Sequence, residues 1–131
     1  MTTPEQAERP RPGSAAVVRA RPGLAIVEVR GEHDLSTEQA LREALRTAAG
    51  HQSVIADLTE CTFADSTALA VLINAAQTAR TRRDRFAVVI PPDVRPVARV
   101  AAMIGLGDML ALHPTRESAL QALESSAGER P

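Results

Sequence analysis

The segment from Ser53 to Ala76 constrains the fold of this chain more than any other part of the sequence. It begins with an apolar run, residues 54–58, that has the length and composition of a buried strand. After a short polar turn, Asp65, Ser66 and Thr67 precede an alanine- and leucine-rich helix. At a helix N-terminus the first backbone N–H groups lack partners within the helix, and the dipole favours negative charge. The two hydroxyls and the carboxylate therefore lie where a chain can hold either a helix cap or a phosphate.

The rest of the chain alternates between candidate strands and candidate helices. The predicted strands are residues 15–20, 24–30, 53–58, 86–90 and 109–112. The predicted helices are residues 37–49, 66–82, 93–104 and a last one that Thr115 caps. Strands that alternate with helices predict an α/β fold with a mixed, mostly parallel sheet of about four to five strands and about four helices packed on it. We expect a single domain over residues 14–124, a disordered tail over 1–13, where proline and charge are frequent, and a flexible tail over 125–131.

Composition excludes several classes of function. The 131 residues include only two aromatic side chains, which removes the usual stacking platform for single-stranded nucleic acid. The net charge is −1, so the chain has no electrostatic footprint for nucleic acid or an acidic membrane. No apolar run approaches a membrane span or a secretory signal, and the single Cys61 fits a reducing compartment. We therefore expect a soluble, cytoplasmic protein with no direct contact with nucleic acid or membrane.

The sequence contains no catalytic or metal-binding constellation. His33, His51 and His113 lie on three separate connections, and none has metal-ligand spacing to another His, Cys or acid. Asp65 stands beside two hydroxyls, but no histidine completes a hydrolytic site there. Cys61 is either a nucleophile or, more commonly for a lone cysteine in such a turn, a small half-buried filler. We expect no catalytic residue, no metal and no cofactor, and an enzyme that uses Cys61 or Asp65 is the alternative.

Helical geometry predicts which side chains of residues 66–82 face solvent. At about 100° per residue one face is apolar and is the expected core stripe: Leu69, Leu72, Ile73 and Ala76. The opposite face contains Thr67, Ala70, Val71, Asn74 and Thr78. Ser66 lies between the two faces and nearer the turn, where an N-cap or first-turn role is expected. For Asp65, capping and orienting an incoming group are both open. The geometry thus predicts that Thr67 points outward beside an exposed Val71.

The segment VIADLTECTFADSTALAVL resembles the central motif of STAS domains of the anti-sigma factor antagonist type. The matching residues are Asp57-Leu58, Phe63, Asp65-Ser66-Thr67 and Leu69. Gly31-Glu32-His33-Asp34 is similar to the Gly-Glu-Leu-Asp of the family, and the resemblance covers roughly residues 15–124. Two positions depart from the pattern. Ala68 stands where the family usually has glycine, which adds a methyl beside the hydroxyls, and His33 replaces a usual apolar residue.

The resemblance implies an anti-sigma factor antagonist that is not an enzyme. Such a protein binds an anti-sigma factor serine/threonine kinase while unphosphorylated, releases a sigma factor, and is switched off by phosphorylation and restored by a protein phosphatase. The family's acceptor, taken as the second hydroxyl of the motif, selects Thr67 ahead of Ser66. The expected partner-binding residues are His33, Asp34, Asp65, Ser66, Thr67, Ala68, Val71 and Asn74. A STAS scaffold or small-ligand-sensing domain in a signalling complex is the alternative function.

Overall fold

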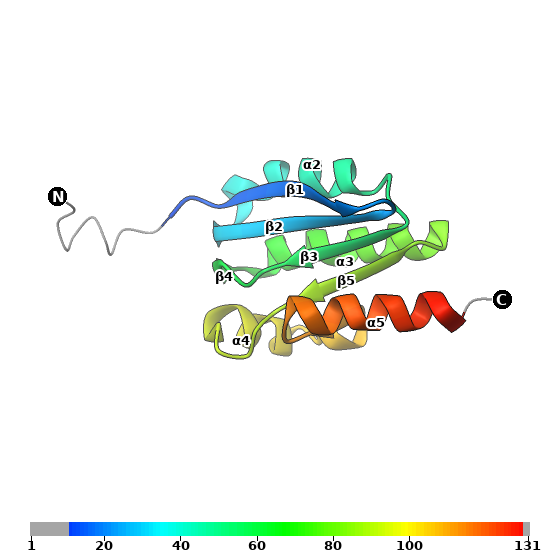
Figure 1. The fold of residues 1–131 in the computed structure, drawn as a ribbon. Coiled ribbons are helices and arrows are strands. Elements are labelled where there is room, and N and C mark those ends of the chain that lie inside the picture. Colours follow the sequence, from blue (N-terminus) through cyan, green and yellow to red (C-terminus); the bar gives the residue numbers. More distant parts are fainter. Residues whose placement is uncertain (1–10, 130–131) are drawn as a thin grey trace, which may run out of the picture.

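A six-stranded mixed sheet forms the centre of the computed structural model, which describes residues 11–129 (Figure 1). Its strands are β1 (Ser14–Arg21), β2 (Leu24–His33), β3 (Ser53–Asp57), β4 (Cys61–Ala64), β5 (Arg85–Val89) and β6 (Ala111–His113). The helices are α2 (Glu38–Ala48), α3 (Ser66–Arg82), α4 (Arg95–Met103) and α5 (Arg116–Glu129), with 3-10 turns η1 (Leu35–Thr37) and η2 (Leu106–Asp108). None of these helices is long and apolar enough to cross a membrane.

The strand order is β1-β2-β3-β5-β6, and β4 pairs with the end of β2. Only the β1–β2 pair is antiparallel, since β2–β3, β2–β4, β3–β5 and β5–β6 are all parallel. The predicted α/β fold, a mostly parallel sheet with four helices, is confirmed. Strand β4 was not predicted from the sequence, and with it the described part of the chain has six strands.

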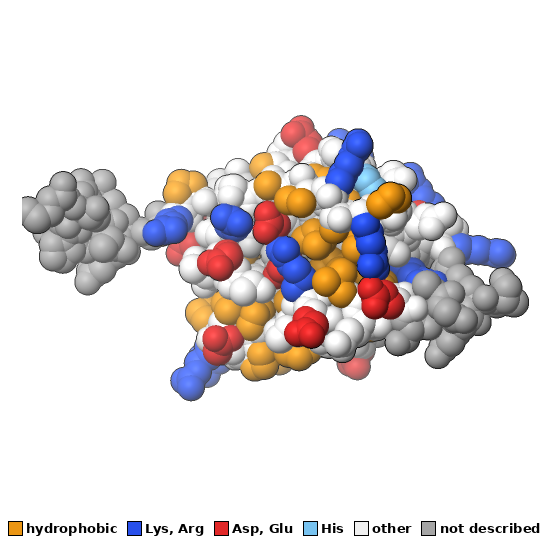
Figure 2. Space-filling model, in the orientation of Figure 1, with side chains coloured by type: hydrophobic (Ala, Val, Ile, Leu, Met, Phe, Trp, Pro, Cys, Tyr) orange, Lys and Arg blue, Asp and Glu red, His pale blue; other side chains and the backbone are white. Residues whose placement is uncertain are grey.

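The helices cover the two faces of the sheet unequally. Helices α2 and α3 lie side by side on one face, and α5 lies on the other (Figure 1). In the same orientation, Figure 2 shows acidic, basic and hydrophobic side chains interspersed on the face toward the viewer. Side chains alternate along β2 accordingly: Ala25, Val27 and Val29 belong to the larger core cluster with α2 and α3, whereas Leu24 and Ile26 pack with α5. Burial on both faces explains why this strand begins as a nearly continuous apolar run.

An ion cluster fixes the start of α5 to the sheet. The Arg116 guanidinium donates from Nε to Asp57 Oδ2 at 2.7 Å and from Nη2 to Glu28 Oε2 at 3.0 Å, and so joins α5 to β3 and β2. Asp57 is buried, and its Oδ1 accepts from the Thr59 N–H at 2.9 Å. Burial alone would raise the pKa of Asp57, but the hydrogen bonds from Thr59 and Arg116 outweigh burial and hold that pKa below its usual value.

The chain ends differ from the expected tails. Residues 1–10 of the predicted disordered tail lie outside the described residues, but residues 11–13 are attached to the sheet. The Glu32 N–H donates to Arg11 O at 3.0 Å, and Pro12 bridges to Glu32 in parallel. Gly13 is required there, because a Cβ would lie 2.3 Å from Glu32 O. At the other end α5 continues to Glu129, past the boundary expected at residue 124, and residues 130–131 lie outside the described part.

We predict that Asp57→Asn lowers the free energy of unfolding at pH 7 by about 1–3 kcal/mol, because it removes the charged acceptor of Arg116. A carboxyl whose pKa is lowered on folding stabilises the folded state only while it is ionised. The difference between wild type and variant should therefore be complete above a pH of about 4 and disappear as the pH falls through the folded pKa. Urea denaturation at pH 7 and in steps from pH 5 to 2 measures this difference. Asp93→Asn is the control, since Asp93 is exposed and has no ion pair among residues 11–124. A difference that stays constant down to pH 2 would contradict the assignment.

Candidate functional site

The junction between β4 and α3 positions the acidic and hydroxyl residues of the central motif. Strand β4 pairs with the last residues of β2, and Ala64 lies in register with His33. The next residue, Asp65, donates its N–H to His33 O at 3.1 Å. Its side-chain Oδ1 accepts from the Ala68 N–H at 2.9 Å, with extended backbone angles of φ −85° and ψ 179°. Of the two roles left open for Asp65, the structure supports capping: Asp65 is the N-cap of α3.

The two hydroxyls differ in accessibility. Ser66 is the first residue of α3 and is exposed, whereas Thr67 is half-buried. Neither hydroxyl has a hydrogen-bond partner among residues 11–124, so neither is committed to holding the helix end. Ser66 is thus a first-turn residue, within the role expected for it, and the N-cap role belongs to Asp65.

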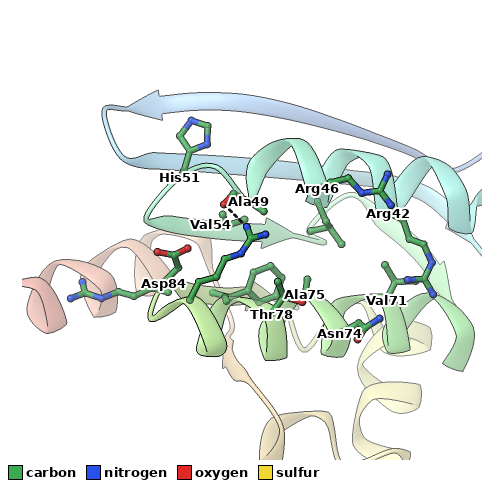
Figure 3. Close-up of a pocket in the computed structure, with 15 residues that line it drawn as sticks. Arg42, Arg46, Ala49, His51, Val54, Val71, Asn74, Ala75, Thr78 and Asp84 are labelled. Atoms are coloured by element: carbon green, nitrogen blue, oxygen red, sulfur yellow. Dashed lines mark hydrogen bonds between the residues drawn. The ribbon is translucent and has the colours of Figure 1, made fainter.

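The predicted solvent face of α3 is partly wrong. Val71 is only 3% exposed and Ala68 only 2%, and both belong to the larger core cluster. Helix α3 packs against α2 as well as against the sheet, and Val71 lies on the side of α3 that faces α2 (Figure 3). Ala70, Asn74 and Thr78 of the predicted face are exposed, and with Ser66, Gln77 and Thr81 they form the exposed stripe of α3. Val71 and Ala68 are therefore not available to a partner, and the extra methyl of Ala68 points into the core.

His33 is also unavailable, because its side chain is completely buried. Its Nε2 lies 3.0 Å from Arg30 O and 3.2 Å from Ser14 O. Both neighbours are carbonyl oxygens, which only accept, so Nε2 carries a proton. Its Nδ1 lies 3.1 Å from the Thr37 hydroxyl. His33 therefore joins β1, β2 and η1 from inside, and its prediction as a partner-binding residue is wrong.

Exposed side chains beside the hydroxyls form a mixed polar and apolar surface. Asp34 is exposed and caps η1 through a 2.9 Å bond from the Ser36 N–H, and hydrogen bonds from Ser36 lower its pKa. The next residue, Leu35, is 71% exposed, and Phe63 on β4 is 39% exposed. Because η1 lies against α3, and β4 leads directly into it, these side chains adjoin the start of the helix. We call Asp34, Leu35, Phe63, Asp65, Ser66, Thr67 and Asn74 the site face.

Sequence reasoning did not select Leu35. One feature of the sequence could have indicated it: Leu35 is an apolar residue between polar neighbours in a turn, where it belongs to no predicted core stripe. Phe63 was noted only as a hydrophobic position of the motif.

The structure argues against a nucleophilic role for Cys61. The thiol is buried, its Sγ donates to Phe63 O at 3.3 Å, and burial raises its pKa to about 11. A thiol with this pKa is almost entirely protonated at neutral pH, whereas the thiolate is the nucleophile. No group of three or more His, Cys, Asp or Glu side chains in the described part of the chain is arranged to hold a metal ion.

Comparison with known proteins gives a consistent result. A family model described as "Mlab, STAS domain" matches residues 16–112. The anti-sigma-F factor antagonist RsfA of Mycobacterium tuberculosis is 32% identical over 111 residues, which cover 82% of this chain and 85% of RsfA. Among solved structures, an anti-sigma factor antagonist from Mycobacterium paratuberculosis superposes with a TM-score of 0.77 at 24% identity, covering 95% of this chain and 99% of that one.

The fold is shared with a protein solved in two states. The anti-sigma factor antagonist SpoIIAA in its unphosphorylated form has a TM-score of 0.70 at 17% identity and covers 86% of this chain and 97% of its own. The phosphorylated form of SpoIIAA from Bacillus has a TM-score of 0.61 at 18% identity, with coverages of 84% and 99%.

The fold and the family model define a STAS domain. More specifically, the chain belongs to the anti-sigma factor antagonist family, whose members are regulators and not enzymes.

We predict that Val71→Asp destabilises the protein by more than about 2 kcal/mol, because it places a carboxylate among buried apolar side chains of α2, α3 and the sheet. Asn74→Asp, one turn further along α3, introduces the same group on the exposed stripe and should change the free energy of unfolding by less than about 0.5 kcal/mol. Thermal and urea denaturation measure both variants. Equal stability of the two variants would show that Val71 is exposed and would contradict its assignment to the core.

Proposed function

We propose that this protein, acting in the cytoplasm, binds an anti-sigma factor with serine/threonine kinase activity while unphosphorylated and thereby frees a sigma factor. Phosphorylation of a hydroxyl at the start of α3 ends the binding, and a protein phosphatase restores it. The observation that carries this proposal is a pair of uncommitted hydroxyls at a capped helix N-terminus, next to exposed apolar side chains. The family supports it, as does the existence of SpoIIAA structures in unphosphorylated and phosphorylated forms.

Exposure supports Ser66 as the acceptor over Thr67. The family resemblance selected Thr67, and the helical wheel agreed because it turned Thr67 outward. The second argument no longer favours Thr67, since Thr67 is half-buried while Ser66 begins the exposed stripe. A kinase has to bring the γ-phosphate in line with the attacking oxygen, which favours the more accessible hydroxyl. We therefore rank Ser66 first and keep Thr67 as the alternative.

The helix end determines how a phosphate would act. A phosphoserine carries about −1.5 to −2 charge at neutral pH. At a helix N-terminus this charge gains roughly 0.3–1 kcal/mol from the dipole, and the neighbouring Asp65 opposes it. Asp65 holds the start of α3 through its N–H and its carboxylate, so we do not expect the phosphate to unfold the helix.

The effect is instead expected at the interface. A dianion beside Leu35 and Phe63 has to lose water against a partner surface shaped for a neutral hydroxyl. Removing an unpaired charge from water costs several kcal/mol, and about 1.4 kcal/mol already corresponds to a tenfold loss of affinity.

We predict that the protein isolated from its own cells carries one phosphate in the tryptic or chymotryptic peptide that contains the start of α3. Ser66→Ala should abolish this modification, and Thr67→Ala should retain it, because the exposed hydroxyl is the accessible acceptor. Mass spectrometry with site-localising fragmentation measures both variants. Retention of the phosphate in Ser66→Ala, with its loss in Thr67→Ala, would assign the acceptor to Thr67 and reverse the ranking.

We also predict that Ser66→Asp weakens binding of the anti-sigma kinase that co-purifies with the protein by at least about tenfold, and leaves the thermal midpoint unchanged within error. Isothermal titration calorimetry measures the affinity. Thr78→Asp is the matched control, because it introduces the same charge on an exposed position of α3 three turns from the hydroxyls. Equal affinity of wild type and Ser66→Asp would contradict the switch.

A further inference from the structure

A groove between α2 and α3 shares only Asn74 with the site face and has its own chemistry. It encloses about 350 Å³, within the lower part of the range for small-ligand sites. Figure 3 shows Arg42 and Arg46 along its α2 side, Val71, Asn74, Ala75 and Thr78 along its α3 side, and His51 at one end. Apolar side chains from both helices and the sheet form its floor: Leu45, Val54, Val71, Ala75 and Phe86.

The arginines around the groove differ in whether their guanidinium groups already have a partner. Arg42 is neutralised by Glu38 at 2.7 Å, and the Arg85 guanidinium leaves the groove to donate to Leu123 O at 2.7 Å. The Arg46 side chain has no ion-pair or hydrogen-bond partner within residues 11–124. Arg82 makes only a long bond of 3.4 Å, to Ala49 O.

Two guanidiniums therefore remain available, one from each helix, against a single carboxylate, Asp84, in the lining. Cations in the last turns of α2 and α3 also complement the helix dipoles. That effect explains where the arginines are in the sequence, but it does not explain why they flank a hollow with an apolar floor.

We propose that this groove binds a small single-chain carboxylate. Its head group pairs with a guanidinium at the rim, that of Arg82 or Arg46, since a guanidinium fork matches carboxylate geometry, and its hydrocarbon chain lies on Phe86 and Ala75. The net positive lining selects the anion, and the apolar floor selects the chain. This site is independent of the phosphorylation switch, because neither Ser66 nor Thr67 lines the groove.

Binding of hexanoate, octanoate and decanoate to the unmodified full chain, each below its micelle concentration, tests the proposal by calorimetry. Each buried methylene should tighten binding about threefold to fourfold until the groove is full. Octanamide, which keeps the chain and loses the charge, should bind at least about tenfold more weakly than octanoate. No saturable binding of decanoate, or equal binding of octanoate and octanamide, would overturn the proposal.

Variants locate the ligand. The double variant Arg46→Gln/Arg82→Gln should reduce octanoate affinity at least about tenfold, and Arg99→Gln, an exposed arginine of α4 outside the groove, should not change it. Ala75→Met should fill the groove and abolish binding, while circular dichroism shows that the fold is kept and kinase binding stays at the wild-type level.

Two further outcomes distinguish the source of the ligand. If inorganic phosphate displaces octanoate and binds with the same affinity as octanoate, the groove is a simple anion site and the proposal is overturned. Co-sedimentation with anionic phosphatidylglycerol vesicles, without binding of free carboxylates, would likewise overturn it, because a membrane surface would then be the ligand.

Discussion

Strand β2 determines where the start of α3 lies, because it pairs in parallel with two successive strands of the same later segment. Its first five residues pair with β3, and its last three pair with β4. The change occurs around Gly31, which has a φ of +77° and would place a Cβ 2.5 Å from Pro12 O. Only glycine tolerates both conditions at no cost. The backbone bond from Asp65 to His33 then joins the helix cap to the end of β2, so the position of the hydroxyls follows from a pairing between residues more than thirty positions apart.

Much of this arrangement follows from patterns that are local in the sequence. The strands of residues 24–30, 53–58 and 86–90 are apolar runs of strand length between turn residues, and the alternation with helices leaves few topologies for a chain of this size. Strand β4 has no such signature. It is four residues long, and its exposed Thr62 and Phe63 lie between buried Cys61 and Ala64. Only its pairing with β2 makes it a strand.

The two hydroxyls lie at the start of α3 as the sequence predicted, and the predicted core stripe of that helix packs in the core, but Val71 was wrongly placed on its solvent face. Helix α3 is rich in alanine, and small side chains give its apolar pattern a weak phase, so the position of a neighbouring helix decides which residues are buried. The sequence contains no direct sign that α2 covers Val71. His33 is a similar case. A polar side chain in a turn is expected to be exposed, and only the fold brings together the three oxygen atoms that His33 contacts, in Ser14, Arg30 and Thr37. Leu35 is the opposite case, because it is an apolar residue that stays exposed in the fold.

The attachment of residues 11–13 restricts how another protein can approach the site face. Glu32 is paired on one side with Phe63 of β4 and on the other side with Arg11 and Pro12. The end of β2 therefore has no free edge next to the hydroxyls, and a partner cannot add a strand to β2 there. A partner that recognises this end of β2 has to use side chains, which differ between related proteins, instead of backbone hydrogen bonds, which any extended peptide can make. A cell with several related antagonists and kinases would gain selectivity from a strand end that its own chain has closed.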